Sequence, residues 1–146
     1  MKTSNKGIEF IKSHEELRLK AYQCPAGVWT IGYGSTGGVR PGDVITEAQA
    51  EVKLREDLRT AEREVGRHKL NINQNQFDAL VSFTFNVGSG SFRNSTLLKR
   101  IKENPNHPDI ENQFGRWIYA KGRVLPGLVK RRKEEANLYT NGIYHL

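Results

Sequence analysis

Apolar residues near the start of the chain recur at helical spacing. Thr3 and Ser4 are good candidates for a helix N-cap, and Ile8 and Ile11 follow three residues apart. Glu15 continues this series one turn later. The pattern predicts a first helix with a carboxylate at the end of its apolar stripe.

A different rhythm follows, in which apolar and polar residues alternate. Alternation over residues 17–21 and again over 28–34 is typical of strands, and Cys-Pro-Ala-Gly at 24–27 is typical of the turn between them. Residues 34–43 are rich in glycine and are expected to form a loop with at most one short strand. We therefore expect a hairpin or a three-stranded sheet.

The rest of the chain carries helical signals. Capping-box patterns begin at Thr46 and at Asn73, and Pro126 and Asn141-Gly142 bracket the last helix. The helices predicted in this part span residues 47–66, 73–88, 91–103, 109–120 and 126–140.

Together these elements predict an α+β fold in a single domain of residues 1–146. A small sheet subdomain occupies about residues 16–45, and a long helix joins it to a helical lobe. That lobe comprises about residues 66–146 and the N-terminal helix, which packs back on it.

Composition and charge exclude several classes of protein. A single cysteine rules out an intramolecular disulfide framework. The charged first residues hold no apolar run typical of a signal peptide, and no stretch approaches the roughly 20 apolar residues of a membrane span. A net charge of +7 favours encounter with polyanions but does not choose among nucleic acid, an anionic envelope and an acidic substrate.

Glu15 is the candidate with the clearest chemistry. Glycoside hydrolysis needs a proton donor beside the leaving oxygen and a second group on the opposite face of the sugar ring. The end of an apolar stripe would partly shield Glu15 from water, as a proton donor near neutral pH requires. The alternative is an ordinary solvated residue at a helix end, beside His14 and Glu16.

The wider pattern extends beyond Glu15. Glu15 is followed after eight residues by Cys24 and, after five more, by Thr30. This arrangement resembles the phage-type lysozymes, the endolysin muramidases of glycoside hydrolase family 24, which carry aspartate or cysteine at the second position. The resemblance continues, in order, through residues 76–88, 91–98, 113–120 and 127–135.

The resemblance implies a lysozyme-like fold and a role for each member of the motif. Glu15 would donate a proton to the glycosidic oxygen between N-acetylmuramic acid and N-acetylglucosamine, while Cys24 and Thr30 would position or activate the nucleophile. Cys24 could act as covalent nucleophile, as base toward water or as a spacer, with a small buried hydrophobe as the alternative. Many family members have histidine where this chain has Ser35, so any pairing made by that histidine is absent or replaced.

By family position, substrate contacts are expected at Asn86, Phe85 and Ser95. Phe85 lies on a largely apolar stretch, where core packing is the alternative, whereas the amide of Asn86 suits the hydroxyl and N-acetyl groups of a sugar. Arg131 is expected to support the catalytic region. Its alternative is a surface ion pair with Glu135, four residues on.

The histidines lack any metal-ligand spacing, so we expect no metal site and no cofactor. A second function remains open: a polyanion-binding module without catalysis. It would use the basic residues of the C-terminal part, Lys121, Arg123, Lys130, Arg131, Arg132 and Lys133. No nucleic-acid motif accompanies these residues.

The leading hypothesis is a monomeric muramidase that acts on bacterial peptidoglycan, with no nucleic acid as partner and no stable membrane insertion. Without a signal or anchor, we expect it to stay in the host cytoplasm until the membrane is permeabilised. It would therefore depend on a holin or another permeabilising partner before it reaches the cell wall.

Overall fold

The computed structural model describes residues 1–145 as seven helices and two two-stranded antiparallel sheets. Among these residues, no helix is both long and apolar enough to cross a membrane. In chain order the elements are α1 (Asn5–Lys12), β1 (Arg18–Gln23), β2 (Trp29–Gly32), α2 (Glu47–Arg67), α3 (Gln74–Val87), α4 (Ser89–Arg93), α5 (Thr96–Glu103), α6 (Ile110–Gly115), β3 (Tyr119–Ala120), β4 (Arg123–Val124) and α7 (Pro126–Asn141).

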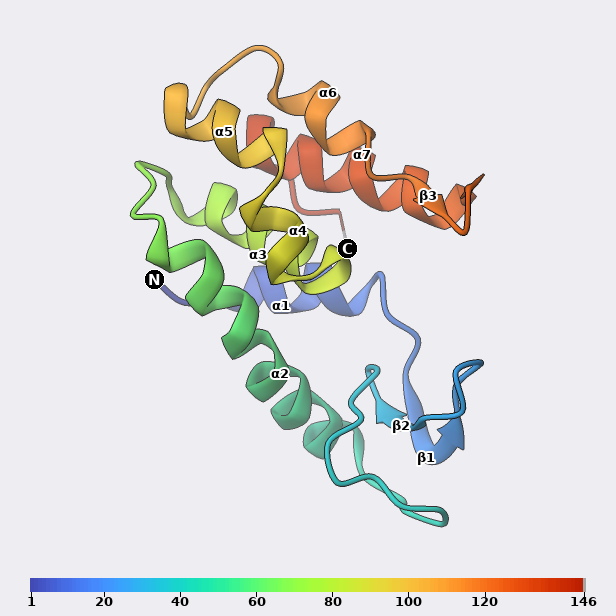
Figure 1. The fold of residues 1–146 in the computed structure, drawn as a ribbon. Coiled ribbons are helices and arrows are strands. Elements are labelled where there is room, and N and C mark those ends of the chain that lie inside the picture. The colour runs from blue at the N-terminus through green and yellow to red at the C-terminus, as the bar shows by residue number, and fades with distance from the viewer. Residues whose placement is uncertain (146) are drawn as a thin grey trace.

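The β1–β2 hairpin lies apart from the helical lobe, and α2 runs between the two (Figure 1). The strands pair antiparallel, with Tyr22 opposite Thr30. A third strand does not form in this sheet; an isolated bridge between Lys20 and Val44 takes its place. The α+β architecture predicted from the sequence, with a long helix joining a small sheet to a helical lobe, is confirmed.

The long helix α2 begins and packs as its sequence predicts. Thr46 and Gln49 form a reciprocal capping box that satisfies backbone N–H groups at the helix start. Its apolar stripe is buried, including Leu54 and Leu58. Burial of one face leaves the opposite, charged face of α2 in solvent.

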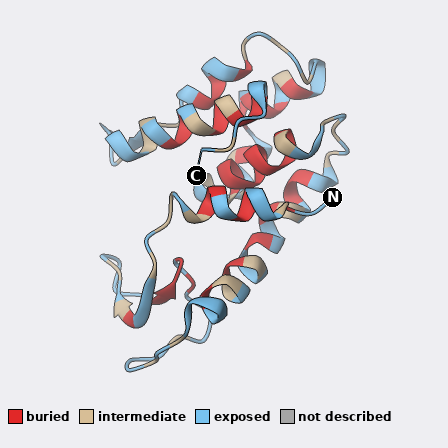
Figure 2. Cartoon of the chain, turned by 180° about the vertical axis from the view of Figure 1, so that it is seen from behind, coloured by how far each residue is buried: buried red, intermediate tan, exposed pale blue. Residues whose placement is uncertain are grey.

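The core of the protein is centred on α3, which packs against α7, α2 and α1. Leu80 and Phe83 are fully buried there. Figure 2 shows the buried residues gathered where the helices meet, while most loops are exposed. Of the two strands in the first sheet, β1 is mostly exposed and β2 is mostly buried. Gly7 permits the close approach of α1, because a Cβ at this position would lie 2.6 Å from Cγ of Asp78 on α3.

Two predicted helices differ from the structure. The segment 91–103 is divided, because Ser95 ends the turn after α4 and caps α5. The helix predicted over 109–120 ends at Gly115, and the β3–β4 hairpin replaces its second half. The carbonyl of Trp117, beyond the end of α6, accepts a hydrogen bond from Nε of Arg132 at 3.0 Å.

Candidate active site

Glu15 lies in the connection between α1 and β1, not on the helical stripe that its spacing predicts. Beyond Lys12 the chain tightens into three-residue turns, in which the N–H of Glu15 donates to the carbonyl of Lys12 at 3.1 Å. The side chain of Glu15 is 23% exposed. It lines a hollow of about 340 Å³ between the end of α1 and the segment after β2, with Leu17 and Tyr33 among the other lining residues.

Arg131 on α7 holds the carboxylate of Glu15. Its Nη1 donates to Oε1 of Glu15 at 2.9 Å, although the two residues are 116 positions apart in the chain. Arg131 is buried, and its Nη2 also donates to the backbone carbonyl of Ser82 at 3.2 Å. The position of Glu15 therefore depends on the docking of α7 against α3.

A second carboxylate, Glu135, lies behind Arg131 and is fully buried. Its Oε2 accepts from Nε of Arg131 at 3.1 Å and from the hydroxyl of Ser82 at 2.6 Å. Its Oε1 accepts from Arg132, and Arg132 also donates to the side-chain carbonyl of Asn86. We call Glu15, Ser82, Asn86, Arg131, Arg132 and Glu135 the acid-side network.

The acid-side network balances two guanidinium groups with two carboxylates. Ion pairs removed from water persist only when each charge is paired and hydrogen-bonded, and both conditions hold here. The pair of Arg131 and Glu135, which the sequence suggested as a surface ion pair, is buried. The burial of Arg131 and Arg132 also removes these two cations from the exposed basic segment that the polyanion-binding alternative would use.

His14 packs beside this network. Its ring lies edge-on against Phe10, with the ring centroids 5.0 Å apart. Burial lowers the pKa of His14 to about 4, and the nearby charges of Arg131, Lys130 and Arg132 act in the same direction. The imidazole is therefore neutral near pH 7, although Oε1 of Glu134 lies 3.6 Å from its Nε2.

Cys24 and Thr30 belong to the β1–β2 hairpin and its turn. The backbone N–H of Cys24 donates to the carbonyl of Val28 at 2.9 Å, and the hydroxyl of Thr30 donates to the same carbonyl at 3.0 Å. Hydrogen bonding from the backbone of Val28 and Ala26 lowers the pKa of the Cys24 thiol, with a smaller effect of the same sign from the Thr30 hydroxyl. The thiol is free and partly exposed.

Ser35 stands where many relatives were expected to carry histidine, and it has a defined partner. Its hydroxyl donates to Oδ2 of Asp57 on α2 at 2.6 Å, and its backbone pairs with Ile31. Ser35 is buried. This contact ties the segment after β2 to the long helix.

Of the three predicted substrate residues, Phe85 and Ser95 lie outside the acid-side network. Phe85 is half-buried and packs against the core. Ser95 is buried, and its hydroxyl accepts from the N–H of Leu98 while donating to the carbonyl of Phe92. Asn86, by contrast, is exposed and lines a hollow of about 420 Å³ with Trp117.

Three residues predicted from the sequence, Glu15, Arg131 and Asn86, belong to the acid-side network. The sequence assigned no role in this network to Ser82, and it suggested Arg132 and Glu135 only as an exposed cation and as a surface partner of Arg131. Arg132 and Glu135 lie within a run of charged residues typical of a solvated helix face, and Ser82 lies in an apolar stretch. The spacing of Arg131 and Glu135 was the only signal of this network. Among residues 1–145, no group of three or more histidine, cysteine or acidic side chains is placed to hold a metal ion.

Comparison with known proteins identifies the family. The family model for phage lysozyme matches residues 12–135. The chain belongs to the phage lysozyme family. It is therefore a glycoside hydrolase of the lysozyme class, a muramidase, as its sequence predicts.

Individual phage lysozyme relatives agree with this assignment. The chain is 44% identical over 144 residues to an endolysin of Acyrthosiphon pisum secondary endosymbiont phage 1, covering 95% of this chain and 98% of that relative. It is 44% identical over 146 residues to an endolysin of Bacillus phage PZA, covering 97% of this chain but only 56% of that relative. Among solved structures, an endolysin from Escherichia coli O157:H7 phage FAHEc1 superposes with a TM-score of 0.91 at 35% identity, covering 100% of this chain and 98% of that chain.

Proposed function

We propose that the chain cleaves bacterial peptidoglycan between N-acetylmuramic acid and N-acetylglucosamine, with Glu15 as the general acid. The observation that carries this proposal is the placement of the Glu15 carboxylate, which is partly exposed at the edge of a hollow and held there by buried Arg131. An acid catalyst needs both features, because it must reach the leaving oxygen and must keep its orientation.

The second group of the reaction comes from the hairpin. Cys24 is partly exposed, and its lowered pKa increases the fraction of thiolate at neutral pH. That supports direct attack on the anomeric carbon or activation of a water molecule more than it supports a passive spacer. Thr30 fixes the turn through its bond to the Val28 carbonyl and so positions Cys24.

The remaining predicted residues act around these groups. We propose that Asn86 contacts the sugar through its amide nitrogen, because its carbonyl is engaged by Arg132. Phe85 and Ser95 stay predictions as substrate contacts, and Arg131 is the positioning residue for Glu15.

Replacement of Glu15 by Gln tests the assignment, with Glu16→Gln as the matched control. Glutamine keeps the shape of Glu15 but does not supply the proton, and loss of general-acid help costs about 10²–10⁴-fold in turnover. Glu16 is exposed and pairs only with Arg18 among the residues described, so E16Q should retain full turnover. Turnover is measured as loss of turbidity of purified cell walls, with a thermal melt of each variant.

If E15Q keeps more than about a tenth of wild-type turnover with an unchanged melt, Glu15 is not the acid. If E15Q and E16Q lose turnover equally, the effect is one of local charge. If the wild-type protein clears no cell walls, the proposed substrate is wrong.

We also propose that the enzyme is a monomer that reaches the wall from the host cytoplasm after a holin or similar partner permeabilises the membrane. The first helix supports this route, because Ile8, Phe10 and Ile11 of α1 are buried in the core and are committed to the fold. Expression in a bacterial host should be tolerated until chloroform or a holin is added. Lysis without either would contradict the proposal.

A further inference from the structure

A further hollow lies away from the acid-side network, between α2 and the N-terminal segment. It has a volume of about 760 Å³ and shares no residue with the network or with the hollow at Glu15. Buried Ile8 and Leu58 contribute apolar surface to it. We call it the arginine groove.

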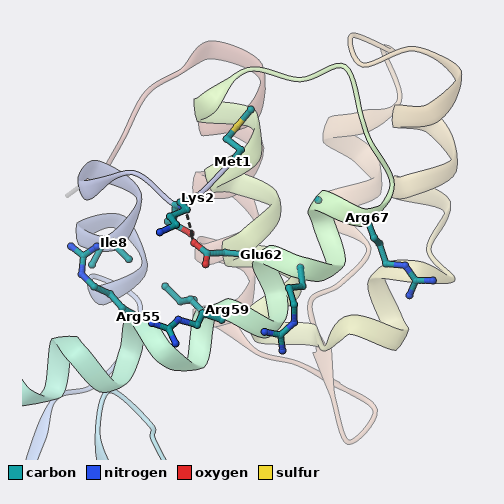
Figure 3. Close-up of a pocket in the computed structure, with 11 residues that line it drawn as sticks. Met1, Lys2, Ile8, Arg55, Arg59, Glu62 and Arg67 are labelled. Carbon is teal, nitrogen blue, oxygen red and sulfur yellow. Dashed lines mark hydrogen bonds between the residues drawn. The ribbon is translucent and has the colours of Figure 1, made fainter.

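Four arginines of α2 line the arginine groove at intervals of four residues: Arg55, Arg59, Arg63 and Arg67. Residues four apart in a helix are neighbours about 6 Å apart along its axis, and each is turned by about 40° relative to the one before. The arginines therefore follow a slow spiral along α2, with Arg59 and Arg63 at its centre. Figure 3 shows Arg55, Arg59 and Arg67 along α2, with Lys2 on the neighbouring N-terminal segment.

The two central arginines are available to a ligand. Among residues 1–145, neither Arg59 nor Arg63 forms an ion pair, and both residues are exposed. Arg63 has one weak contact, to the hydroxyl of Thr60 at 3.4 Å. The outer arginines are partly engaged: Arg55 with Glu51 at 3.2 Å and Arg67 with Glu64 at 3.5 Å.

The single carboxylate in the groove does not neutralise these arginines. Oε2 of Glu62 accepts hydrogen bonds from both the backbone N–H and the hydroxyl of Thr3, each at 2.7 Å. Glu62 thus fastens the N-terminal segment to α2 and forms no ion pair with a groove arginine among the described residues. Arg55 and Arg67 are paired with carboxylates outside the groove, which leaves Arg59, Arg63 and Lys2 as its cations without an ion pair among residues 1–145, beside Glu62.

We propose that the arginine groove binds a linear phosphate-bearing polymer of the bacterial envelope and so holds the enzyme on the wall while Glu15 acts elsewhere. Guanidinium groups bind phosphate through two parallel N–H···O bonds, and a series of them suits a chain with repeated phosphates better than a single anion. The aliphatic stems of the exposed arginines would pack against the carbon units that link the phosphates. The ligand follows from the proposed wall substrate, but binding does not require Glu15.

The experiment measures binding of the intact protein to poly(glycerol phosphate) over a range of salt concentrations. Arg59→Gln with Arg63→Gln is compared with Lys121→Gln and Arg123→Gln, which removes two exposed cations from the β3–β4 hairpin and lowers net charge equally. The groove pair should weaken binding about tenfold or more. It should also make log K less steeply dependent on log salt, because fewer phosphates are then neutralised. The hairpin pair should change neither by much.

A third variant separates geometry from charge. Arg59→Lys with Arg63→Lys keeps both charges but loses the forked donors, so it should keep the salt slope and bind less tightly than wild type. Hydrolysis of phosphate-free peptidoglycan fragments should be unchanged in all three double variants. This second assay distinguishes failure of the binding proposal from failure of the proposed function. Wild type that binds the polymer without hydrolysing fragments would contradict only the function, and wild type that hydrolyses fragments without binding the polymer would contradict only the groove proposal.

If the groove and hairpin double variants weaken polymer binding equally, the effect comes from net charge alone and the proposal is wrong. Unchanged binding in the groove double variant would also contradict the proposal. If wild type binds phosphatidylglycerol vesicles or duplex DNA through Arg59 and Arg63 but does not bind poly(glycerol phosphate), the groove belongs to a different ligand and the proposal fails.

Discussion

The two sides of the proposed active site are built in different ways. On one side, Glu15 is held by Arg131, a buried side chain from the last helix, within a network that reaches Glu135 and Asn86. On the other side, Cys24 and Thr30 are held by the backbone of a single turn, through the carbonyl of Val28. One side depends on long-range charge pairing and the other on local hydrogen bonds.

This difference predicts how each side responds to substitution. Buried charges that lose a partner are costly, so the acid side should respond through the stability of the whole fold. Cys24 lies at the partly exposed turn of the hairpin and takes part in no buried ion pair, although Thr30 and Ile31 of β2 are buried. Changes at Cys24 should therefore alter chemistry while leaving stability nearly intact.

The largest effect is expected for Glu135→Gln. Glutamine leaves the guanidinium groups of Arg131 and Arg132 buried without their shared counter-charge, so the free energy of unfolding should fall by about 3–5 kcal/mol. Urea unfolding measures it. The control is Glu103→Gln, which removes an exposed pair with Arg100 and should cost no more than about 1 kcal/mol. Similar losses in both variants would contradict a special role for the network.

The next effect is pH dependence from His14. Its pKa is about 4 in the folded protein and near 6.5 when unfolded, so the unfolded state binds more protons between these values. Stability is therefore lost as pH falls from about 6.5 through about 4, by up to about 3 kcal/mol. Unfolding curves of wild type and His14→Gln across this range should show a flatter dependence in the variant.

Glu64 also makes stability depend on pH, but over a lower pH range than His14. Hydrogen bonds from Arg93, and then from His68, lower the pKa of Glu64 to about 2. Its stabilisation is present above pH 4.5 and is lost as pH falls through about 2, mostly below the range for His14. If His14→Gln follows the wild-type curve between about pH 6.5 and 4, the titrating group in that range is another residue.

The next effect, at Cys24, is on activity and not on stability, and it corresponds to a smaller free energy than the two above. Cys24→Ala should lower turnover more than about tenfold, equivalent to about 1.4 kcal/mol, with an unchanged melting temperature. Cys24→Asp should keep substantial activity, because the family pattern accepts either residue. Alkylation of the wild-type thiol by iodoacetamide should be slowed by bound oligosaccharide. Full activity in Cys24→Ala would leave the thiol without a chemical role.

The smallest effect is expected for Ser35→Ala. Loss of the hydrogen bond to Asp57 should lower the free energy of unfolding by about 1 kcal/mol. Thr36→Ala, at the exposed neighbouring residue, is the control and should be close to neutral. A loss above about 3 kcal/mol would show that the hairpin side also depends on buried pairing.

Much of the fold follows from local sequence signals. The capping boxes at Thr46 and Asn73, the proline at the start of α7 and the glycine at its end all mark helix limits that the structure confirms. The second half of the helix predicted over 109–120 was wrong, because α6 ends at Gly115 and the chain turns back at Lys121 and Gly122, both with positive φ, to form the β3–β4 hairpin. The helical spacing of Phe114, Trp117 and Ile118 outweighed this turn signal in the prediction.

The candidate site also contains one part that the sequence predicts and one part that it does not. The motif of Glu15, Cys24 and Thr30 is visible in the sequence because its spacing is short and resembles a known family. Arg132 and Glu135 were expected at the surface because charged residues on a helix are usually solvated, and only tertiary packing buries these. Ser82, in an apolar stretch, was not predicted. The roles of all these residues in catalysis remain predictions for the variants above.

The 116-residue separation between Glu15 and Arg131 also has a consequence for synthesis. A nascent chain presents Glu15, Cys24 and Thr30 to the cell long before α7 leaves the ribosome. Until that helix docks, the acid lacks its positioning partner, so a ribosome-bound chain that ends before Pro126 should be inert toward cell walls. Docking of α7 would then be the step that activates the enzyme, and stalled chains, extended by a linker long enough to bring α7 out of the ribosome, should gain activity only once α7 has emerged.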